Sequence, residues 1–345
     1  MSLLEIKGLE TEFQTEQGVV KALRGINYMV DRGEVLGIVG ESGSGKSVGM
    51  LSLMGLLAPN GTVTAGEMIF DGEDISPIKY KTKKEKKEYE KKMNQIRGND
   101  ISMIFQDPMS YLNPIVTIEK QMTEGIRFHT KCSKKEAVQR AIELMKMVGI
   151  PAPESRLKQY PFEFSGGMRQ RIIIAIALAC NPKLIVADEP TTALDVTVQA
   201  QILDLLKDIT KESNAGVIII THDLGVVASL CDRISIMYGG NIMEEGTTDE
   251  IFYDPKHPYT KGLLNSIANS NVDHREPLKP IPGTPPDLLK LGDQCPFASR
   301  CSEAMEICTK ASPLVTEFGE THKCKCWLHC KERWHEVWKG EDAYE

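Results

Sequence analysis

The chain has 345 residues, 41% of them hydrophobic and 26% charged, which is typical of a globular protein with room for two hydrophobic cores. Its formal net charge of −7 argues against a general nucleic-acid-binding protein, because phosphate contacts need a basic surface. The N-terminus lacks the charged-then-apolar order of a signal peptide, and no apolar run approaches the roughly 20 residues of a spanning helix, so we expect a cytosolic chain.

Strands and turns are predicted at the N-terminal end. Residues 3–10 and 21–28 alternate roughly with period two, and turn signals lie at Gln17-Gly18 and Arg32-Gly33. Phe13 lies just before the first turn and, taken alone, is expected to be a packing residue rather than a ligand. The apolar run 35–39 predicts a buried strand.

A phosphate-binding loop is predicted directly after that strand. The segment GESGSGKS at 40–47 has the G-x-x-x-x-G-K-[ST] pattern, and the apolar segment 48–54 can continue as a buried helix. Glycines let backbone N–H groups point inward around an anion, and the positive end of the helix adds to the same field. We expect Lys46 to reach the outer phosphates and Ser47 to bind Mg²⁺. The predicted nucleotide ligands here are Gly40, Ser42, Gly43, Ser44, Gly45, Lys46, Ser47 and Val48.

The next segment contains an edge strand and a basic run. Pro59-Asn60-Gly61 marks a turn, and residues 66–72 predict an edge strand that ends in an Asp-Gly turn. Residues 79–97 contain nine Lys and Arg against three Glu. We interpret this run as a solvated, partly helical face, with contact to acidic lipid headgroups as the alternative.

Residues 101–105 predict a compact apolar strand that ends on Gln106. The Gln106 amide either caps the strand or reaches a metal ion or an attacking water. Helical apolar spacing follows at 115–128 and 134–148, and prolines then end the helical region.

The segment FSGGMRQR at 164–171 predicts a helix start with an unusual first turn. Ser165 can serve as the N-cap of a helix that is apolar all round at 172–179, with Arg169 and Arg171 solvated. Two glycines in a first turn cost about 1 kcal/mol each. The presence of Gly166 and Gly167 in this turn is explained if their backbone N–H groups bind an anion.

Two buried strands deliver polar residues at their C-terminal ends. Residues 184–187 are followed by Asp188 and Glu189, and residues 216–220 by Thr221-His222-Asp223. Adjacent carboxylates repel each other unless a cation or a proton lies between them. Asp188 suits the Mg²⁺ shell and Glu189 suits deprotonating a water, while we expect His222 to touch the reacting phosphate rather than serve a structural role.

In order and spacing, these segments resemble the ATPase subunits of ABC transporters. The family motifs are GESGSGKS (Walker A), Gln106 (Q-loop), FSGGMRQR (signature), LIVADEP (Walker B), Ala193-Leu194-Asp195 (D-loop) and His222 (H-loop). The signature has Phe164 and Met168 in place of the commoner Leu and Gln, but its Ser165-Gly166-Gly167 core is intact. The resemblance covers about residues 1–250.

The resemblance implies an α/β P-loop NTPase fold. Its parts would be a RecA-like mixed-sheet core, an N-terminal antiparallel β subdomain and a helical subdomain at about 107–182. It also implies that Phe13 stacks on adenine and that Gln106 joins Ser47 and Asp188 around Mg²⁺. Ser165, Gly166 and Gly167 would bind the ATP of a partner subunit in a head-to-tail dimer.

Residues 254–264, 281–286 and 292–301 resemble the C-terminal extension of oligopeptide and dipeptide importer ATPases, which implies a second domain at 251–345. The implied function is ATP hydrolysis coupled to peptide uptake, at the cytoplasmic face of the cell membrane. The implied partners are two membrane permease subunits, a paralogous ATPase and, indirectly, a solute-binding protein. The alternatives are an importer ATPase for nickel or another small solute, a soluble ABC ATPase outside transport, and a sensor that uses ATP and a metal cluster.

Six of the nine cysteines lie between residues 295 and 330. Cytosolic thiols are kept reduced, so a metal site is the leading explanation. Wide spacings favour an iron–sulfur cluster, although the C-x₃-C pair at 326–330 keeps zinc open. Unmetallated thiols in a loose tail are the remaining alternative. The resemblance implies a [4Fe–4S] cluster on Cys295, Cys301, Cys308 and Cys326, the last chosen because His322-Lys323-Cys324-Lys325 precedes it.

Overall fold

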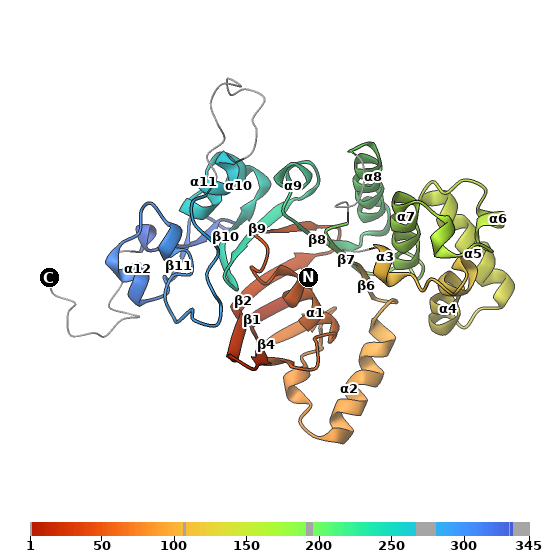
Figure 1. The fold of residues 1–345 in the computed structure, drawn as a ribbon, viewed down its shortest axis with the longest axis horizontal. Helices are drawn as coiled ribbons and strands as arrows, with labels where there is room; N and C mark the ends of the chain where they lie inside the picture. Colours follow the sequence, from red (N-terminus) through yellow and green to blue (C-terminus); the bar gives the residue numbers. More distant parts are fainter. Residues whose placement is uncertain (1, 106–107, 191–195, 267–280, 331, 334–345) are drawn as a thin grey trace. The chain divides into compact units, whose positions relative to one another are not determined.

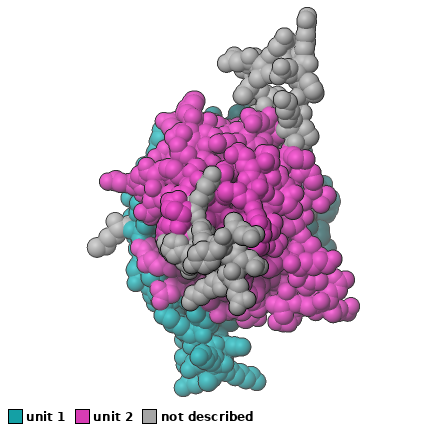
Figure 2. All heavy atoms as spheres, turned by 90° about the vertical axis from the view of Figure 1, so that its left-hand side faces the viewer, with its two compact units in different colours: residues 1–4, 29–36, 69–221 teal, residues 5–28, 37–68, 222–345 magenta. Residues whose placement is uncertain are grey.

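The structure is a computed structural model that describes residues 2–105, 108–190, 196–266, 281–330 and 332–333. The chain forms two compact units (Figure 2). Unit 1 consists of residues 1–4, 29–36 and 69–221, and unit 2 of residues 5–28, 37–68 and 222–345. Each unit is therefore assembled from segments that lie far apart in the sequence.

The N-terminal strands form one sheet, most of whose residues belong to unit 2. Its strands are β1 (Ser2–Thr15), β2 (Gly18–Asp31), β4 (Gly61–Phe70) and β5 (Glu73–Asp74), in the order β2-β1-β4-β5 (Figure 1). A two-residue turn joins β1 to β2, as in an antiparallel hairpin, and β4 pairs antiparallel with β5. The predicted strands at 3–10 and 21–28 are confirmed, and both extend beyond the alternating pattern.

Strand β3 (Val35–Val39) is buried at all five positions, as its unbroken apolar run predicts. Its first two residues belong to unit 1 and the other three to unit 2. Helix α1 (Lys46–Met54) begins two residues earlier than the apolar segment indicates, inside the glycine-rich loop. Gly45 is its N-cap, with a left-handed φ of 102° that favours glycine.

The sheet of unit 1 contains three parallel strands in the order β8-β7-β6. They are β6 (Ile101–Ile104), β7 (Leu184–Asp188) and β8 (Gly216–Thr221). Ile101 pairs with Leu184, and Leu184 pairs with Gly216. Every position of the three strands is buried, which explains why they are apolar on both faces. Because parallel strands end at the same edge, the residues after β7 and β8 lie at one edge of this sheet.

Helix α2 (Lys83–Ile96) carries the basic run of unit 1. Thr82 and Glu85 form a capping box at its start, and its buried side chains are Tyr89, Met93 and Ile96. The other positions are exposed or half-buried, so the predicted solvated, partly helical face is confirmed.

The remaining helices of unit 1 include a packed group formed by α4, α5 and α7 (Figure 1). They are α3 (Pro108–Tyr111), α4 (Ile118–Thr130), α5 (Lys134–Met147), α6 (Pro153–Arg156), α7 (Gly166–Ala177) and α8 (Val196–Ser213), with the 3₁₀ helices η1 (Pro77–Lys79) and η2 (Pro161–Glu163). The helices predicted near 115–128 and 134–148 are confirmed as α4 and α5. None of the described helices is long and apolar enough to cross a bilayer.

In unit 2, the C-terminal third of the chain adds an antiparallel sheet in the order β11-β12-β10-β9. Strand β12 pairs with β10 through Cys324 and Glu244, so the cysteine-rich segment extends the sheet that begins with β9. The elements are α9 (Leu224–Leu230), β9 (Arg233–Tyr238), β10 (Asn241–Thr247), α10 (Thr248–Tyr253), α11 (Pro258–Asn265), η3 (Ala298–Arg300), α12 (Glu306–Lys310), β11 (Val315–Glu317), β12 (Lys323–Lys325) and η4 (Trp327–His329).

Candidate functional site

The loop between β3 and α1 closes around the Lys46 side chain. The Lys46 ammonium donates hydrogen bonds to the carbonyl oxygens of Gly40 at 2.7 Å and Glu41 at 2.9 Å, and the residue is only 7% exposed. Lys46 is also the first residue of α1, so its charge lies at the positive end of a helix. The loop therefore presents a cation and backbone N–H groups from the same few residues, as phosphate binding requires.

Two glycines of this loop have no room for a side chain. A Cβ at Gly40 would lie 2.1 Å from the carbonyl oxygen of Met237, and one at Gly45 would lie 2.8 Å from that of Ala22. Backbone atoms of β2 and β9 thus pack directly against the loop. The glycines in the predicted pattern are therefore required by close packing as well as by backbone conformation.

Ser44 has a buried hydroxyl that the described residues do not satisfy. Its backbone carbonyl accepts from Gly240 N–H at 3.0 Å, but its Oγ is buried and has no hydrogen-bond partner in the part of the chain that the structure describes. Such an atom is costly unless a ligand or water completes it. The residues of the loop therefore fit an anion with oxygen acceptors.

The carboxylate pair lies in unit 1, at the end of β7. Asp188 is the last strand residue, is 6% exposed and pairs with Ile220 of β8. Glu189 is half-buried and has a φ of 47°, in the left-handed region that a non-glycine residue seldom adopts. Its backbone N–H donates to the Ile220 carbonyl oxygen at 2.8 Å, which holds the chain in this turn. Such unusual backbone geometry is common at functional sites.

His222 follows β8 directly and has an exposed side chain. The next residue, Asp223, caps α9 by accepting hydrogen bonds from the N–H groups of Gly225 and Val226. Because Asp188 pairs with Ile220, Glu189 and His222 follow neighbouring strand ends, as the sequence predicts.

The signature segment begins α7 as predicted. The Ser165 side chain accepts from the Met168 N–H at 3.3 Å, which confirms Ser165 as the N-cap. Ser165 and Gly166 are exposed, and apart from its chain neighbours and the backbone of its own helix, no described atom lies within 4 Å of where a Cβ of Gly166 would be. Gly167 is half-buried. The first turn of this 12-residue helix therefore offers open N–H groups at its positive end.

The prediction that Arg169 and Arg171 are solvated is wrong. Arg169 Nε donates to the carbonyl oxygens of Pro161 at 2.8 Å and Phe164 at 3.0 Å, and Arg171 binds the Val148 carbonyl oxygen at 3.2 Å. Main-chain carbonyls near the start of α7 and after α5 are satisfied in this way. The two arginines hold the signature helix in place.

Sequence reasoning missed Gln170 in the same helix. Gln170 is 1% exposed, and its side-chain amide donates to the Pro190 carbonyl oxygen at 2.8 Å. It thus ties α7 to the residue after Glu189. Its polar character within an apolar helix is the signal that could have identified it.

Three other residues from the predicted motifs lie outside the loop and strand ends described above. The half-buried ring of Phe13 lies on β1 against Gly61 of β4, where a Cβ would be 2.7 Å from the ring. Gln106 and Asp195 lie outside the described residues.

The cysteine-rich segment of unit 2 brings the four predicted ligands into electrostatic reach of one another. Cys295, Cys308 and Cys326 are buried and Cys301 is half-buried, and the Cys295 N–H donates to the Cys308 carbonyl oxygen at 2.9 Å. Burial raises the pKa of the Cys295 thiol to about 12, and the thiols of Cys308, Cys326 and Cys301 act in the same direction. Among the described residues, however, no group of three or more His, Cys, Asp and Glu side chains could hold a metal ion.

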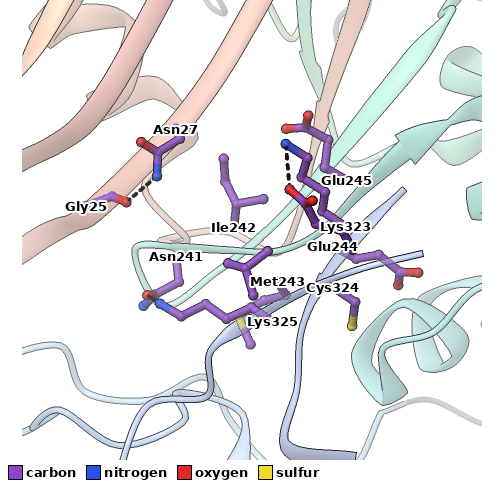
Figure 3. A pocket seen from close by; sticks show the side chains of 12 residues that line it. Gly25, Asn27, Asn241, Ile242, Met243, Glu244, Glu245, Lys323, Cys324 and Lys325 are labelled. Atoms are coloured by element: carbon purple, nitrogen blue, oxygen red, sulfur yellow. Dashed lines mark hydrogen bonds and ion pairs between the residues drawn. The ribbon is translucent and has the colours of Figure 1, made fainter. Parts of the chain in front are cut away.

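A separate pocket of about 250 Å³ lies in unit 2 (Figure 3). Lys323 pairs with Glu317, and Lys325 donates to the Asn241 side chain at 2.8 Å. The pocket contains none of the predicted site residues, and its lining residues are Gly25, Asn27, Asn241, Ile242, Met243, Glu244, Glu245, Val315, Glu317, Lys323, Cys324 and Lys325.

Comparisons with known proteins agree with this arrangement. Residues 23–192 match the family described as "ABC transporter", and residues 243–308 match "Oligopeptide/dipeptide transporter, C-terminal region". The oligopeptide transport ATP-binding protein OppD of Bacillus subtilis (strain 168) is 52% identical over 94% of this chain and 88% of its own length. The dipeptide transport ATP-binding protein DppD of the same organism is 48% identical over 98% of both chains.

The fold is also similar to solved structures. The ATP-binding cassette MJ0796, in a dimeric post-hydrolysis state bound to ADP and Pi, matches with a TM-score of 0.62 and 29% identity. The match covers 71% of this chain and 98% of that chain. The predicted fold class is confirmed.

Proposed function

The chain belongs to the family of ATP-binding subunits of oligopeptide and dipeptide ABC transporters, and from this we propose that it is the ATP-hydrolysing subunit of an importer for di- or oligopeptides. The phosphate loop carries the proposal, because a buried lysine, a helix N-terminus and an unsatisfied Ser44 hydroxyl meet there after a buried strand. The proposed domains are 1–250 for the nucleotide-binding domain, with its helical subdomain at about 107–182, and 251–345 for the extension.

The site residues have chemistry suited to ATP hydrolysis. The Lys46 ammonium would bind the outer phosphates. Mg²⁺ prefers hard oxygen ligands, and it would be held by oxygens of Ser47, Gln106 and the buried Asp188. When bound, the ion supplies charge stabilisation at the phosphate oxygens. Glu189 accepts the proton of the attacking water, and His222 orients that water and the γ-phosphate.

The signature segment acts on the ATP of a partner subunit. Ser165 and Gly166 are exposed at the positive end of α7, and a Cβ at Gly166 would meet nothing described beyond its own helix and chain neighbours within 4 Å. A second ATPase subunit, arranged head to tail, would bring its phosphates to this surface. The proposed second subunit is a paralogue of this chain.

Exposed apolar side chains in the helical region support docking to membrane subunits. Tyr111, Ile115 and Phe162 are 51%, 81% and 66% exposed. We take these side chains as candidate contacts with another protein. We assign this region to two permease subunits, which would place the chain at the cytoplasmic face of the membrane as a peripheral subunit. A solute-binding protein would act on it only through the permease.

We propose that four cysteines would hold a [4Fe–4S] cluster, although the described side chains do not form a metal-binding group, so cluster binding would have to draw the thiols together. Cys295, Cys301, Cys308 and Cys326 supply thiols only, which suits iron–sulfur ligation, and the other three thiols add to the burial that raises the pKa of Cys295. Zinc bound by the same residues is the alternative content of the site.

Purification and transport assays test the function. Mild detergent extraction of the tagged chain should recover two permease subunits and a second ATPase in equal amounts, and recovery of the chain alone would favour a soluble ATPase outside transport. In vesicles that contain the complex, a di- or oligopeptide with its solute-binding protein should stimulate ATP hydrolysis. Stimulation by nickel instead would overturn the peptide assignment. Lys46→Ala should abolish ATP hydrolysis whether peptide or nickel is the stimulating solute.

A further inference from the structure

Glu41, the second residue of the phosphate loop, is held by side chains that lie far along the chain in unit 2. Arg300 Nη1 donates to the Glu41 carboxylate at 2.7 Å and to the Tyr238 hydroxyl at 3.0 Å. The backbone N–H of Glu41 donates to the Tyr259 hydroxyl at 3.0 Å. Both the side chain and the main chain of Glu41 are therefore fixed from outside the loop.

Arg300 has a defined position of its own. Its side chain is 5% exposed, and its Nε and Nη2 donate to the carbonyl oxygens of Pro282 at 2.8 Å and Ile281 at 3.3 Å. It adjoins the packed rings of Tyr238, Tyr259 and Phe297, whose centroids lie 4.6 to 5.3 Å apart. An arginine bound on several sides cannot move without disturbing the loop or the segment 281–300.

A second set of contacts joins the same C-terminal segment to the other side of the loop. Arg24 of β2 donates to the carbonyl oxygens of Leu291 at 2.6 Å and Gly292 at 3.0 Å. The Arg24 N–H donates to the Gly240 carbonyl oxygen, and the Gly240 N–H donates to that of Ser44. The turn between β9 and β10 thus connects the phosphate loop to residues 291–292 through short hydrogen bonds.

The charge of Glu41 explains why its ion pair with Arg300 would affect phosphate binding. A carboxylate in a loop that binds polyphosphate repels the ligand unless a cation neutralises it. Arg300 pairs with the Glu41 carboxylate at 2.7 Å and belongs to a segment outside the loop, so the cation that neutralises this loop carboxylate comes from the C-terminal segment.

We propose that Arg300 is a positioning residue for nucleotide binding, through which the C-terminal segment 281–301 sets the affinity of the phosphate loop for ATP. The inference rests on the proposed nucleotide site. By thermodynamic linkage, bound nucleotide must also stabilise the segment that tightens its binding.

Titration of the full-length chain with ATP measures the affinity that the proposal concerns. Arg300→Gln should raise the dissociation constant for ATP by at least about fivefold, the lower range of coupling between sites. Glu41→Gln alone should not weaken ATP binding, because an amide oxygen still accepts from Arg300 and the loop loses a negative charge. Adding Glu41→Gln to Arg300→Gln should restore much of the lost affinity, because the uncompensated carboxylate is removed. A double variant as weak as Arg300→Gln would indicate a merely structural role and overturn the proposal.

Two further measurements complete the test. Lys310→Gln breaks an ion pair with Glu306 on the same extension, where Glu306 is largely exposed, and should leave ATP affinity unchanged. In the wild-type chain, a non-hydrolysable ATP analogue should slow amide hydrogen exchange in residues 281–301, which requires no variant to fold. Unchanged exchange, or wild-type affinity in Arg300→Gln, would overturn the proposal.

Lys46→Ala distinguishes a failure of the proposed nucleotide site from a failure of the proposed role of Arg300. If Lys46→Ala loses ATP binding but Arg300→Gln does not, the role of Arg300 alone is wrong. If Lys46→Ala binds ATP like the wild type, the proposed nucleotide site itself is wrong.

Discussion

Asp188 of β7 lies opposite Ile220 of β8, and the Glu189 N–H donates to the carbonyl oxygen of that same Ile220 at 2.8 Å. The chain therefore turns immediately after Asp188, in a left-handed conformation at Glu189. Two adjacent carboxylates receive different surroundings as a result: Asp188 is buried at the strand end and Glu189 is half-buried beyond it. Different surroundings suit the different roles that we propose for the two residues, Asp188 as a magnesium ligand and Glu189 as the base for the attacking water.

Glu189→Gln tests that division of roles. The amide retains the size of the side chain but cannot accept a proton, so ATP binding should persist while turnover falls by at least about 10². Steady-state ATPase assays and ATP titration measure the two properties separately. Glu212→Gln, at an exposed position of α8, is the control and should keep wild-type turnover. Near-normal turnover in Glu189→Gln would rule out Glu189 as the base.

The local parts of the fold could be predicted from the sequence. The apolar run at 35–39, the glycine-rich loop and the apolar strands before Asp188 and His222 are each specified by neighbouring residues. Element ends were less accurate: α1 begins inside the loop because Gly45 adopts a left-handed conformation that hydrophobic spacing does not reveal.

Contacts between distant residues were not predictable in the same way. Glu41 and Arg300 are 259 positions apart, and neither has a local pattern that indicates the other. Arg169 and Arg171 were expected in solvent because charge alone favours exposure, yet carbonyl groups after α5 and around η2 bind them. A single sequence does not show which main-chain groups need such donors.

The exposed signature segment leads to a prediction about protein concentration. Ser165 and Gly166 are exposed at the start of α7. If they bind the ATP of a partner, as we propose, a phosphate loop on one chain should need α7 of another for rapid hydrolysis. Specific ATPase activity should rise with the concentration of the chain, or when the partner ATPase is added. Ser165→Arg should block this rise by filling the site while ATP binding to the isolated chain stays normal. A specific activity independent of concentration and of the partner would indicate a self-sufficient monomer.

His257 predicts an acid-sensitive step in stability. Burial lowers the pKa of His257 to about 3, and the charges of His329 and Lys261 act in the same direction. The unfolded chain binds a proton at this residue below about pH 6.5, whereas the folded chain stays neutral until about pH 3. The free energy of unfolding should therefore fall as the pH falls through this window.

His257→Asn provides the measurement. His257 caps α11 by accepting from the Tyr259 N–H at 3.0 Å, and an asparagine oxygen can replace that acceptor without titrating. Urea unfolding of the variant at pH 7.5, 6.0 and 5.0 should show a shallower decline in stability than the wild type. His129→Asn, at a half-buried histidine, should change the slope less. Equal slopes in His257→Asn and wild type would show that His257 is not responsible.

The final prediction concerns the cysteines near the C-terminal end. Burial raises the pKa values of Cys295 and Cys326 to about 12, so in the metal-free fold both are neutral thiols in a segment with few other apolar residues. Metal binding would add stability that such a segment lacks. Protein purified without oxygen should be brown and contain about four irons per chain. Cys295→Ser, Cys301→Ser, Cys308→Ser and Cys326→Ser should each lower the iron content while ATP binding at Lys46 persists.

The neighbouring cysteines serve as matched controls in that experiment. Cys324 pairs with Glu244 in the sheet, and the Cys330 thiol donates to the Cys326 carbonyl oxygen at 3.4 Å, so both have positions in the fold that do not depend on iron. Cys324→Ser and Cys330→Ser should therefore keep their iron. Full iron in Cys326→Ser together with loss in either control would move the fourth ligand to that residue. Colourless anaerobic protein with one zinc per chain would replace the cluster by a zinc site, because a single tetrahedral zinc ion can also bind four thiolates.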